Sequence, residues 1–462
     1  MSAPVIWIGL PCITAIVFWF IRKNERTTLL VGLGASFLFT LTAIITPVGK
    51  PLLQIGTFVI QISTSINLLG RSFTFTNGDL VYASFVFLIL FLFLCMSFII
   101  EISDKFAPIG FLMTGVILGA LSVQPFLYAA LLLELCVLLS LLLVSEQGHL
   151  PTAGGMRFLI FQTLAMPFML AAGWVLSAVE ANPTETTLVF QALGLIGLGF
   201  TFWLAVFPFN FWMPQLAGEK SPFLTGFILM LFNTATLILV MRYLDGFVWL
   251  RDDARIFVVL RFLGVLMLVS SSILFLFEKN KYRTTAYLIS FETGMSLLAL
   301  SLNQTIGWNA FVMMFIPRII SMSFWIASLT YLQQNSKHDE QRANQIIHPL
   351  LIGSFLAAGL SIAGFPLLPG FFTRLSILGS LASLDLQSFI WVGVGNTLFV
   401  IAIIRFIRNL YLENKSEPLS ISSKVEKGYF MISIALLGLI GFFPQIFISG
   451  VLVMLQAFPN LK

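Results

Sequence analysis

Apolar runs of about 20 residues recur along the whole chain, and each is long enough to cross a hydrocarbon core of roughly 30 Å. Hydrophobic residues make up 58% of the 462 residues and charged residues only 10%, and the mean hydropathy is +0.98. This composition excludes an ordinary soluble domain. We therefore predict an all-α polytopic membrane protein in a lipid bilayer, with about fourteen transmembrane helices. The runs are 3–22, 27–46, 80–100, 106–123, 126–145, 157–179, 187–212, 223–243, 256–277, 285–302, 308–332, 348–382, 387–411 and 428–456.

The positive charges indicate a topology. Arg22, Lys23 and Arg26 follow the first apolar run instead of preceding it, which argues against a cleavable signal peptide. Most of the other Lys and Arg residues lie in the loops after odd-numbered runs. By the positive-inside tendency, we expect a cell (plasma or inner) membrane protein with both termini on the non-cytoplasmic side. The net charge of +5 then reflects topology, and no nucleic-acid partner is expected.

The polar segments carry little chemistry of their own. Residues 52–79 partly alternate apolar and polar side chains, a pattern that fits a surface hairpin as well as an ordered surface loop. The three cysteines are scattered without metal-ligand spacing, and the sequence has no nucleotide-binding glycine loop. We therefore expect no metal, no cofactor and no redox catalysis in this chain.

Two apolar runs contain helix-breaking residues. Pro208 removes a backbone donor inside the seventh run, and Pro366, Pro369 and Gly370 lie inside the twelfth. Paired, interrupted spans are a mark of transporter-like repeats, although a kink that only shapes packing is the alternative. The two segments are LAVFPFNFWMPQLAGEKSPFLTG from Leu204 and LSIAGFPLLPGFFTRLSIL from Leu360.

Four charged residues fall well inside the predicted spans: Glu134, Glu292, Arg318 and Arg374. Ionised groups at membrane depth are energetically expensive and normally face the protein interior, paired or hydrated. Chain proximity makes Arg318 the expected counter-ion of Glu292. Arg374, four residues past Gly370, is expected to donate hydrogen bonds or bind water beside the unwound turn.

The spacing of these groups suggests a repeat. Glu134 lies 74 residues before Pro208, and Glu292 lies 74 residues before Pro366. A shift of 158 residues therefore superimposes a carboxylate and a helix-breaking proline. Two halves of one repeated design would produce this match, and chance is the alternative.

Several motifs in order resemble the antiporter-like membrane subunits of respiratory complex I and their relatives in Mrp antiporters and membrane-bound hydrogenases. The resemblance runs from about Phe106 to Leu412. VMRYL at the end of the eighth span is similar to the subunit N type of NADH:quinone oxidoreductase. The other motifs are FPFNFWMPQLAGEKSPFLTG and LSIAGFPLLPGFFTR around the broken helices 7 and 12, LLLELCVLLSLLLV around Glu134, and RTTAYLISFETG opening helix 10.

This resemblance implies fourteen core helices with two inverted five-helix repeats and broken helices 7 and 12. It places the N-terminal helices 1–3 in residues 1–105, the repeats in 106–243 and 256–412, and the last helix in 413–462. It implies other membrane subunits of a complex I-like assembly as partners, with quinone reached only through them. It also matches Glu134 to the family's helix 5 glutamate and Arg374 to the usual position of the helix 12 lysine.

The chain departs from the family pattern at two central lysines. The helix 7 lysine position falls on Trp203, and the helix 8 lysine position falls on Asn233. An indole is donor-only, and an amide does not titrate near neutrality. Arg374 stays protonated in a protein, so it can set a field but hardly relay a proton.

Three functions follow from the sequence. The first is a membrane-arm subunit of a complex I-like NADH or ferredoxin:quinone oxidoreductase whose own proton channel is altered, with Glu134 coupling to the next subunit. The second is an active proton or cation translocator, of the Mrp antiporter or membrane hydrogenase kind. The third is a stand-alone secondary transporter. The second would use a different line of residues, namely Glu134, Asn210, Asn233, Glu292 and Arg374.

Overall fold

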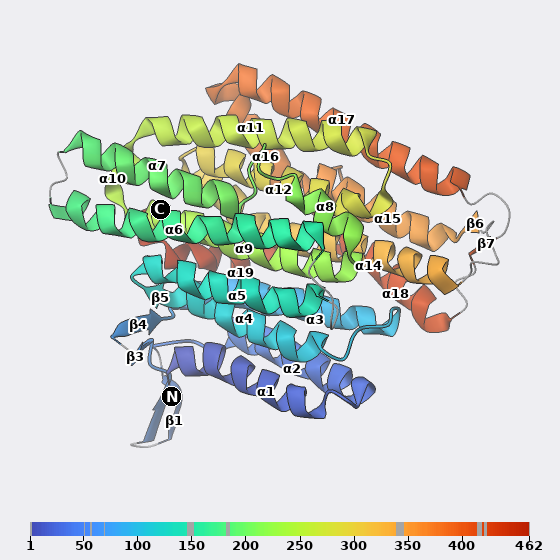
Figure 1. Cartoon of the computed structure of the whole chain (residues 1–462), viewed down its shortest axis with the longest axis horizontal. Helices are drawn as coiled ribbons and strands as arrows, with labels where there is room; N and C mark the ends of the chain where they lie inside the picture. Colours follow the sequence, from blue (N-terminus) through green and yellow to red (C-terminus); the bar gives the residue numbers. More distant parts are fainter. Residues whose placement is uncertain are drawn as a thin grey trace.

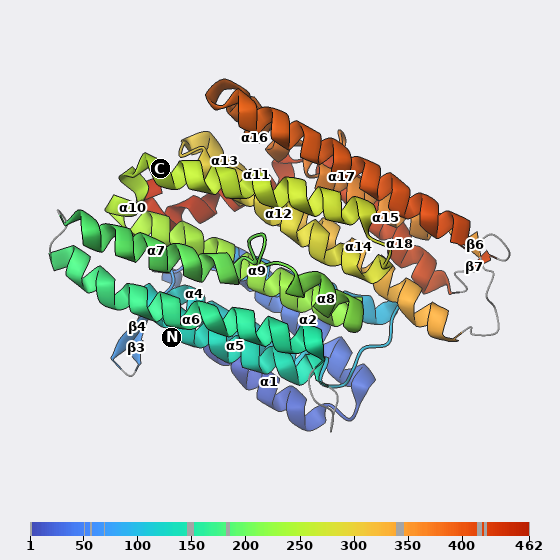
Figure 2. The ribbon, with the colours of Figure 1, turned by 45° about the horizontal axis from the view of Figure 1, so that its top comes forward.

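The computed structural model describes residues 2–49, 51–55, 58–68, 70–145, 152–181, 185–338, 346–413, 418–419 and 423–461. Its long helices run side by side as one bundle (Figures 1 and 2). The helices are α1 (Leu10–Ile21), α2 (Glu25–Ile45), α3 (Asn77–Cys95), α4 (Phe106–Ser122), α5 (Ala129–Val144), α6 (Ala153–Ala181), α7 (Thr186–Trp203), α8 (Trp212–Glu219), α9 (Pro222–Gly246), α10 (Val248–Asp252), α11 (Ala254–Phe277), α12 (Thr284–Ser301), α13 (Thr305–Met313), α14 (Phe315–His338), α15 (Pro349–Ala363), α16 (Phe371–Leu384), α17 (Leu386–Glu413), α18 (Lys424–Phe442) and α19 (Gln445–Leu452).

The helices agree with the predicted apolar runs, since each run overlaps at least one helix. Among the described residues, ten helical segments are long and apolar enough to cross a membrane. Five further apolar helices are shorter, and three of these lie in runs that a break divides. The prediction of an all-α polytopic membrane protein is confirmed, whereas the number of fourteen spans and the repeat boundaries stay predictions.

Burial separates central helices from peripheral ones. In its most apolar stretch α9 is 94% buried, whereas α6 is 28% buried and α18 is 28% buried. A helix that is apolar all round packs in a core, and one with an exposed apolar face meets lipid or another subunit. Helices α9, α12 and α14 therefore form the centre of the bundle, where the charged residues lie.

Short strands lie at one end of the bundle (Figure 1). Strands β1 (Pro51–Ile55) and β2 (Phe58–Gln61) pair antiparallel, as do β3 (Ser65–Leu68) and β4 (Arg71–Thr74). Strand β4 also pairs with β5 (Val123–Gln124). Residues 52–79 thus contain two antiparallel strand pairs, where a surface hairpin was one of the two predictions; residues 56–57 and 69 lie outside the described residues. Elsewhere β6 (Ile346–Ile347) pairs parallel with β7 (Pro418–Leu419).

The two predicted helix breaks are present. Helix α7 ends at Trp203 and α8 begins at Trp212, with Pro208 between them. Helix α15 ends at Ala363 and α16 begins at Phe371, so Pro366, Pro369 and Gly370 all lie in the second break. The chain leaves α15 through Gly364, whose φ of 75° and ψ of 40° are left-handed and suit a glycine at a helix C-terminus. A further short break separates α13, which ends four residues before Pro317, from α14, and this proline was not singled out as a helix breaker from the sequence.

Candidate functional site

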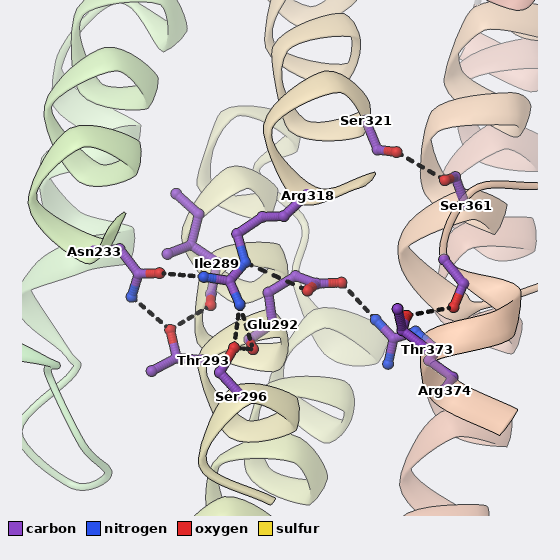
Figure 3. Close-up of polar contacts among 11 residues, drawn as sticks. Asn233, Ile289, Glu292, Thr293, Ser296, Arg318, Ser321, Ser361, Thr373 and Arg374 are labelled. Carbon is purple, nitrogen blue, oxygen red and sulfur yellow. Dashed lines mark hydrogen bonds and ion pairs between the residues drawn. The ribbon is translucent and has the colours of Figure 1, made fainter. Parts of the chain in front are cut away.

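A cluster of buried charges lies at the centre of the second half of the chain (Figure 3). The Glu292 carboxylate, on α12, accepts a hydrogen bond from Arg374 on α16, with 2.5 Å between Nη2 and Oε1. Its other oxygen, Oε2, lies 3.5 Å from Nε of Arg318 on α14. None of the three residues is more than 5% exposed. Arg318 is thus a counter-ion of Glu292 as predicted, and Arg374 is a second and closer one.

Arg318 also joins α9 to the cluster. Its Nη1 donates to Oδ1 of Asn233 over 3.3 Å, and its Nη2 donates to the Glu292 carbonyl over 3.4 Å and to the Ser296 hydroxyl. The Asn233 amide nitrogen donates to Thr293 Oγ1 over 2.7 Å. Both ends of the Asn233 amide are therefore engaged at the position where the family resemblance expects a lysine.

Two glycines allow Arg374 to reach Glu292. A Cβ on Gly364 would lie 2.0 Å from Cδ of Arg374, so the arginine side chain passes directly over the break. A Cβ on Gly370 would lie 2.2 Å from the carbonyl oxygen of Ser361, so the two arms of the broken helix approach closely there. The guanidinium also lies 4.9 Å from the ring centroid of Phe291, a contact that favours a cation. The break thus positions a charge beside Glu292.

The cluster carries two guanidinium groups on one carboxylate. An isolated charge in a low-dielectric interior is costly, and a carboxylate offsets that cost only for the groups it pairs with. Nη1 of Arg374 has no hydrogen-bond partner among the described residues. Arg374 also lines a cavity of about 10 Å³, together with Ser361 and Thr373. This is room for about one water molecule. Because guanidinium keeps its proton, both cations of the site are fixed charges.

Glu134 and Asn210 lie outside this hydrogen-bonded cluster. Glu134, on α5, is partly exposed and accepts a hydrogen bond from Thr163 on α6 over 2.8 Å. Within the described ranges, no hydrogen bond or ion pair joins Glu134 to Glu292 or its arginines. Asn210 is buried in the first break, where its carbonyl accepts from the Met213 N–H over 3.0 Å.

Trp203 packs against an aromatic ring at the first helix break. It is the last residue of α7, its side chain is buried, and its ring centroid lies 5.7 Å from that of Phe200. The Gln162 amide on α6 donates to the Trp203 carbonyl over 3.4 Å. Where the resemblance expects a lysine, the chain therefore has packed rings.

A second buried ion pair was missed by sequence reasoning. Arg242, near the end of α9, donates to Oδ1 of Asp79 over 2.6 Å and to the Tyr82 hydroxyl over 2.7 Å. Asp79 also forms the capping box of α3 with Thr76. The charge at Arg242 inside an apolar run was a signal, but nothing in the sequence linked it to a residue 163 positions away. The pair ties α9 to α3 near the strands.

A family model described as "NADH:quinone oxidoreductase/Mrp antiporter, TM" matches residues 125–400, more than half of the chain. The chain belongs to this family. Subunit N of the NADH-quinone oxidoreductase of Pelagibacter ubique is 26% identical over 259 residues, covering 54% of this chain and 54% of that protein. Chain 4 2 of the NAD(P)H-quinone oxidoreductase of Trichodesmium erythraeum is 25% identical over 272 residues, covering 56% of this chain and 47% of that protein. This chain thus spans about half the length of the curated relatives it matches.

Solved structures share the fold over nearly the whole length of this chain. A chain of an archaeal membrane-bound sulfane sulfur reductase superimposes with a TM-score of 0.81 and 18% identity, covering 100% of both chains. A chain of respiratory complex I from Thermus thermophilus gives 0.76 and 18%, covering 99% of both. A chain of the Mrp complex of Dietzia sp. gives 0.76 and 15%, covering 100% of this chain and 98% of that one. At these identities the likeness establishes the fold.

Proposed function

We propose that this chain is a membrane-arm subunit of a complex I-like NADH or ferredoxin:quinone oxidoreductase, in which its own proton path is altered. It would support assembly and proton translocation by its neighbours. The observation that carries the proposal is the Glu292 carboxylate held between Arg318 and Arg374. A carboxylate fixed by two cations that do not titrate sets a field across the bundle and is poorly suited to hand on a proton.

The two lysine positions support the same reading. Asn233 is hydrogen-bonded to both Arg318 and Thr293, and Trp203 is buried against the ring of Phe200. A lysine at 233 would add a third cation beside a single carboxylate, which like-charge repulsion opposes. A lysine at 203 would replace a buried ring with an ammonium group.

The surface around Glu134 supports neighbouring subunits as partners. Glu134 is partly exposed on α5, and an ionisable group facing lipid at membrane depth is costly. A stripe of exposed leucines shares this helix and gives an apolar face for another subunit to cover. These are Leu131, Leu135, Leu138 and Leu142.

Deletion and gain-of-function variants test the proposal. Deleting the chain should prevent assembly of the membrane complex that copurifies with a tagged copy, and intact assembly would reject the structural role. Trp203→Lys with Asn233→Lys should produce no added proton translocation per electron, because neither position offers a lysine a counter-ion. A raised proton-to-electron ratio in that double variant would overturn the altered path.

The alternative is an active proton or cation translocator through Glu134, Glu292 and Arg374. The water-sized cavity that Arg374 and Glu292 both line favours it, because a bound water there could pass a proton to Glu292. In this case Glu134→Gln lowers the proton-to-electron ratio without lowering complex abundance, whereas the matched surface change Glu185→Gln does not. An unchanged ratio in Glu134→Gln rejects the alternative.

The proposed topology has both termini on the non-cytoplasmic side. Reporter fusions at each terminus test it, with activity of a periplasmic-type reporter expected at both. Activity of a cytoplasmic reporter at either terminus would contradict it.

A further inference from the structure

A deep apolar cleft separates α7 from α11 where the two halves of the chain meet. Its volume is about 320 Å³, and its lining is almost entirely hydrocarbon. One wall comes from α7, including Gly197 and Phe200, and the opposite wall from α11, including Val259 and Leu263. Tyr243 of α9 forms part of the floor. Helices α7 and α11 run alongside one another in both views of the ribbon (Figures 1 and 2).

The length of the cleft matches one leaflet of a bilayer. Along α7 the lining extends from Phe190 to Thr201, which is about 16 Å at 1.5 Å per residue. Half of a hydrocarbon core of roughly 30 Å is about 15 Å. Beyond Thr201 the cleft ends at Leu204 and Val206, inside the break that follows α7. It therefore leads from near the start of α7 to the break that follows this helix.

A cation lies at the outer end of the cleft. The Arg255 side chain is 75% exposed, and its guanidinium lies 5.6 Å from the ring centroid of Phe190 at the rim. Its paired carboxylate, Asp253, is 3.9 Å away, so Arg255 keeps donors for a phosphate group. The nearby carboxylate favours a headgroup that also carries an ammonium group over a purely anionic one.

We propose that this cleft binds one membrane glycerophospholipid, with an acyl chain between α7 and α11 and its phosphate on Arg255. The occupant is a lipid because the cleft is apolar, one leaflet deep and capped by a cation at its surface end. The acyl chain ends against the break next to Trp203, where the family resemblance expects a lysine. The acyl chain thus fills with hydrocarbon a region that would have to contain water in a working proton path.

The test is the lipid content of the purified membrane complex. Gly197 faces open space, with no atom within 4 Å of where its Cβ would lie, and it lines the cleft. Gly197→Leu therefore places an apolar side chain in the cleft, with open space around its Cβ. Gly194, one turn earlier on α7, also faces open space but is not part of the lining, so Gly194→Leu is a control with the same change in helix propensity.

The complexes are transferred to nanodiscs of phosphatidylethanolamine or phosphatidylglycerol, extracted into detergent, and their retained lipids counted by native mass spectrometry. The expected result is one retained phosphatidylethanolamine fewer per chain in Gly197→Leu and no loss in Gly194→Leu. Arg255→Gln, which leaves the cleft open, should weaken retention about fivefold, the contribution of one basic residue near a phosphate. Equal lipid counts in the two glycine variants would overturn the proposal. Retention of an isoprenoid quinone or a peptide segment in place of phospholipid would also overturn it.

Discussion

Replacing Glu292 with glutamine removes the one carboxylate of the buried cluster. In the unmodified protein, the nearest nitrogens of Arg374 and Arg318 lie 2.5 and 3.5 Å from the Glu292 carboxylate oxygens. The neutral amide of the variant leaves the charges of both guanidinium groups uncompensated. Breaking a buried ion pair from one side costs about 3–5 kcal/mol. At about 1.36 kcal/mol per factor of ten, this shifts the folding equilibrium by roughly 100-fold or more. We expect a large loss of assembled protein.

The charge-balanced variant Glu292→Gln with Arg374→Gln should recover much of that loss. It returns the cluster to its original net charge and leaves Arg318 with Asn233 and Ser296 as hydrogen-bond acceptors. The assay compares the amount of chain in assembled membrane complexes and its thermal unfolding, with Glu185→Gln as the surface control. The reasoning is refuted if Glu292→Gln is as abundant and stable as the control, or if the double variant is no better than Glu292→Gln.

Two further predictions concern positions that shape the bundle. Gly364→Ala should destabilise the protein by more than about 1 kcal/mol, because it places a Cβ at a left-handed φ of 75° and against Arg374. Thermal unfolding measures this loss. The control Gly379→Ala should show no such loss, because its added Cβ meets open space. Arg242→Met should strand the buried Asp79 carboxylate and cost about 3–5 kcal/mol, and adding Asp79→Asn should restore most of it. A stability of Arg242→Met equal to that of the double variant would contradict the role of this ion pair.

The helix breaks could be predicted because proline and glycine act locally. Pro208 removes a donor wherever it stands in a helix, and Gly370 is the residue type that two closely packed arms require. The apolar runs predicted the helices because the thickness of the bilayer sets the length of a membrane-spanning helix.

The contact of Arg374 with Glu292 could not be predicted from the sequence, although the contact of Arg318 could. Glu292 and Arg318 are 26 residues apart on neighbouring helices, whereas Arg374 is 82 residues from Glu292. Its side chain was expected at the unwound turn, and it reaches Glu292 because Gly364 leaves a path over the break. Such contacts depend on how helices pack across the bundle, which no local pattern encodes.

The central claim is that the Glu292 cluster sets a fixed field and does not carry the transported proton. The most direct test is the proton-to-electron ratio of assembled complexes that contain the charge-balanced variant Glu292→Gln with Arg374→Gln, normalised to the amount of complex. The account predicts the ratio of the unmodified complex. A lower ratio at equal electron transfer would show that Glu292 is part of a working proton path, and would contradict the account.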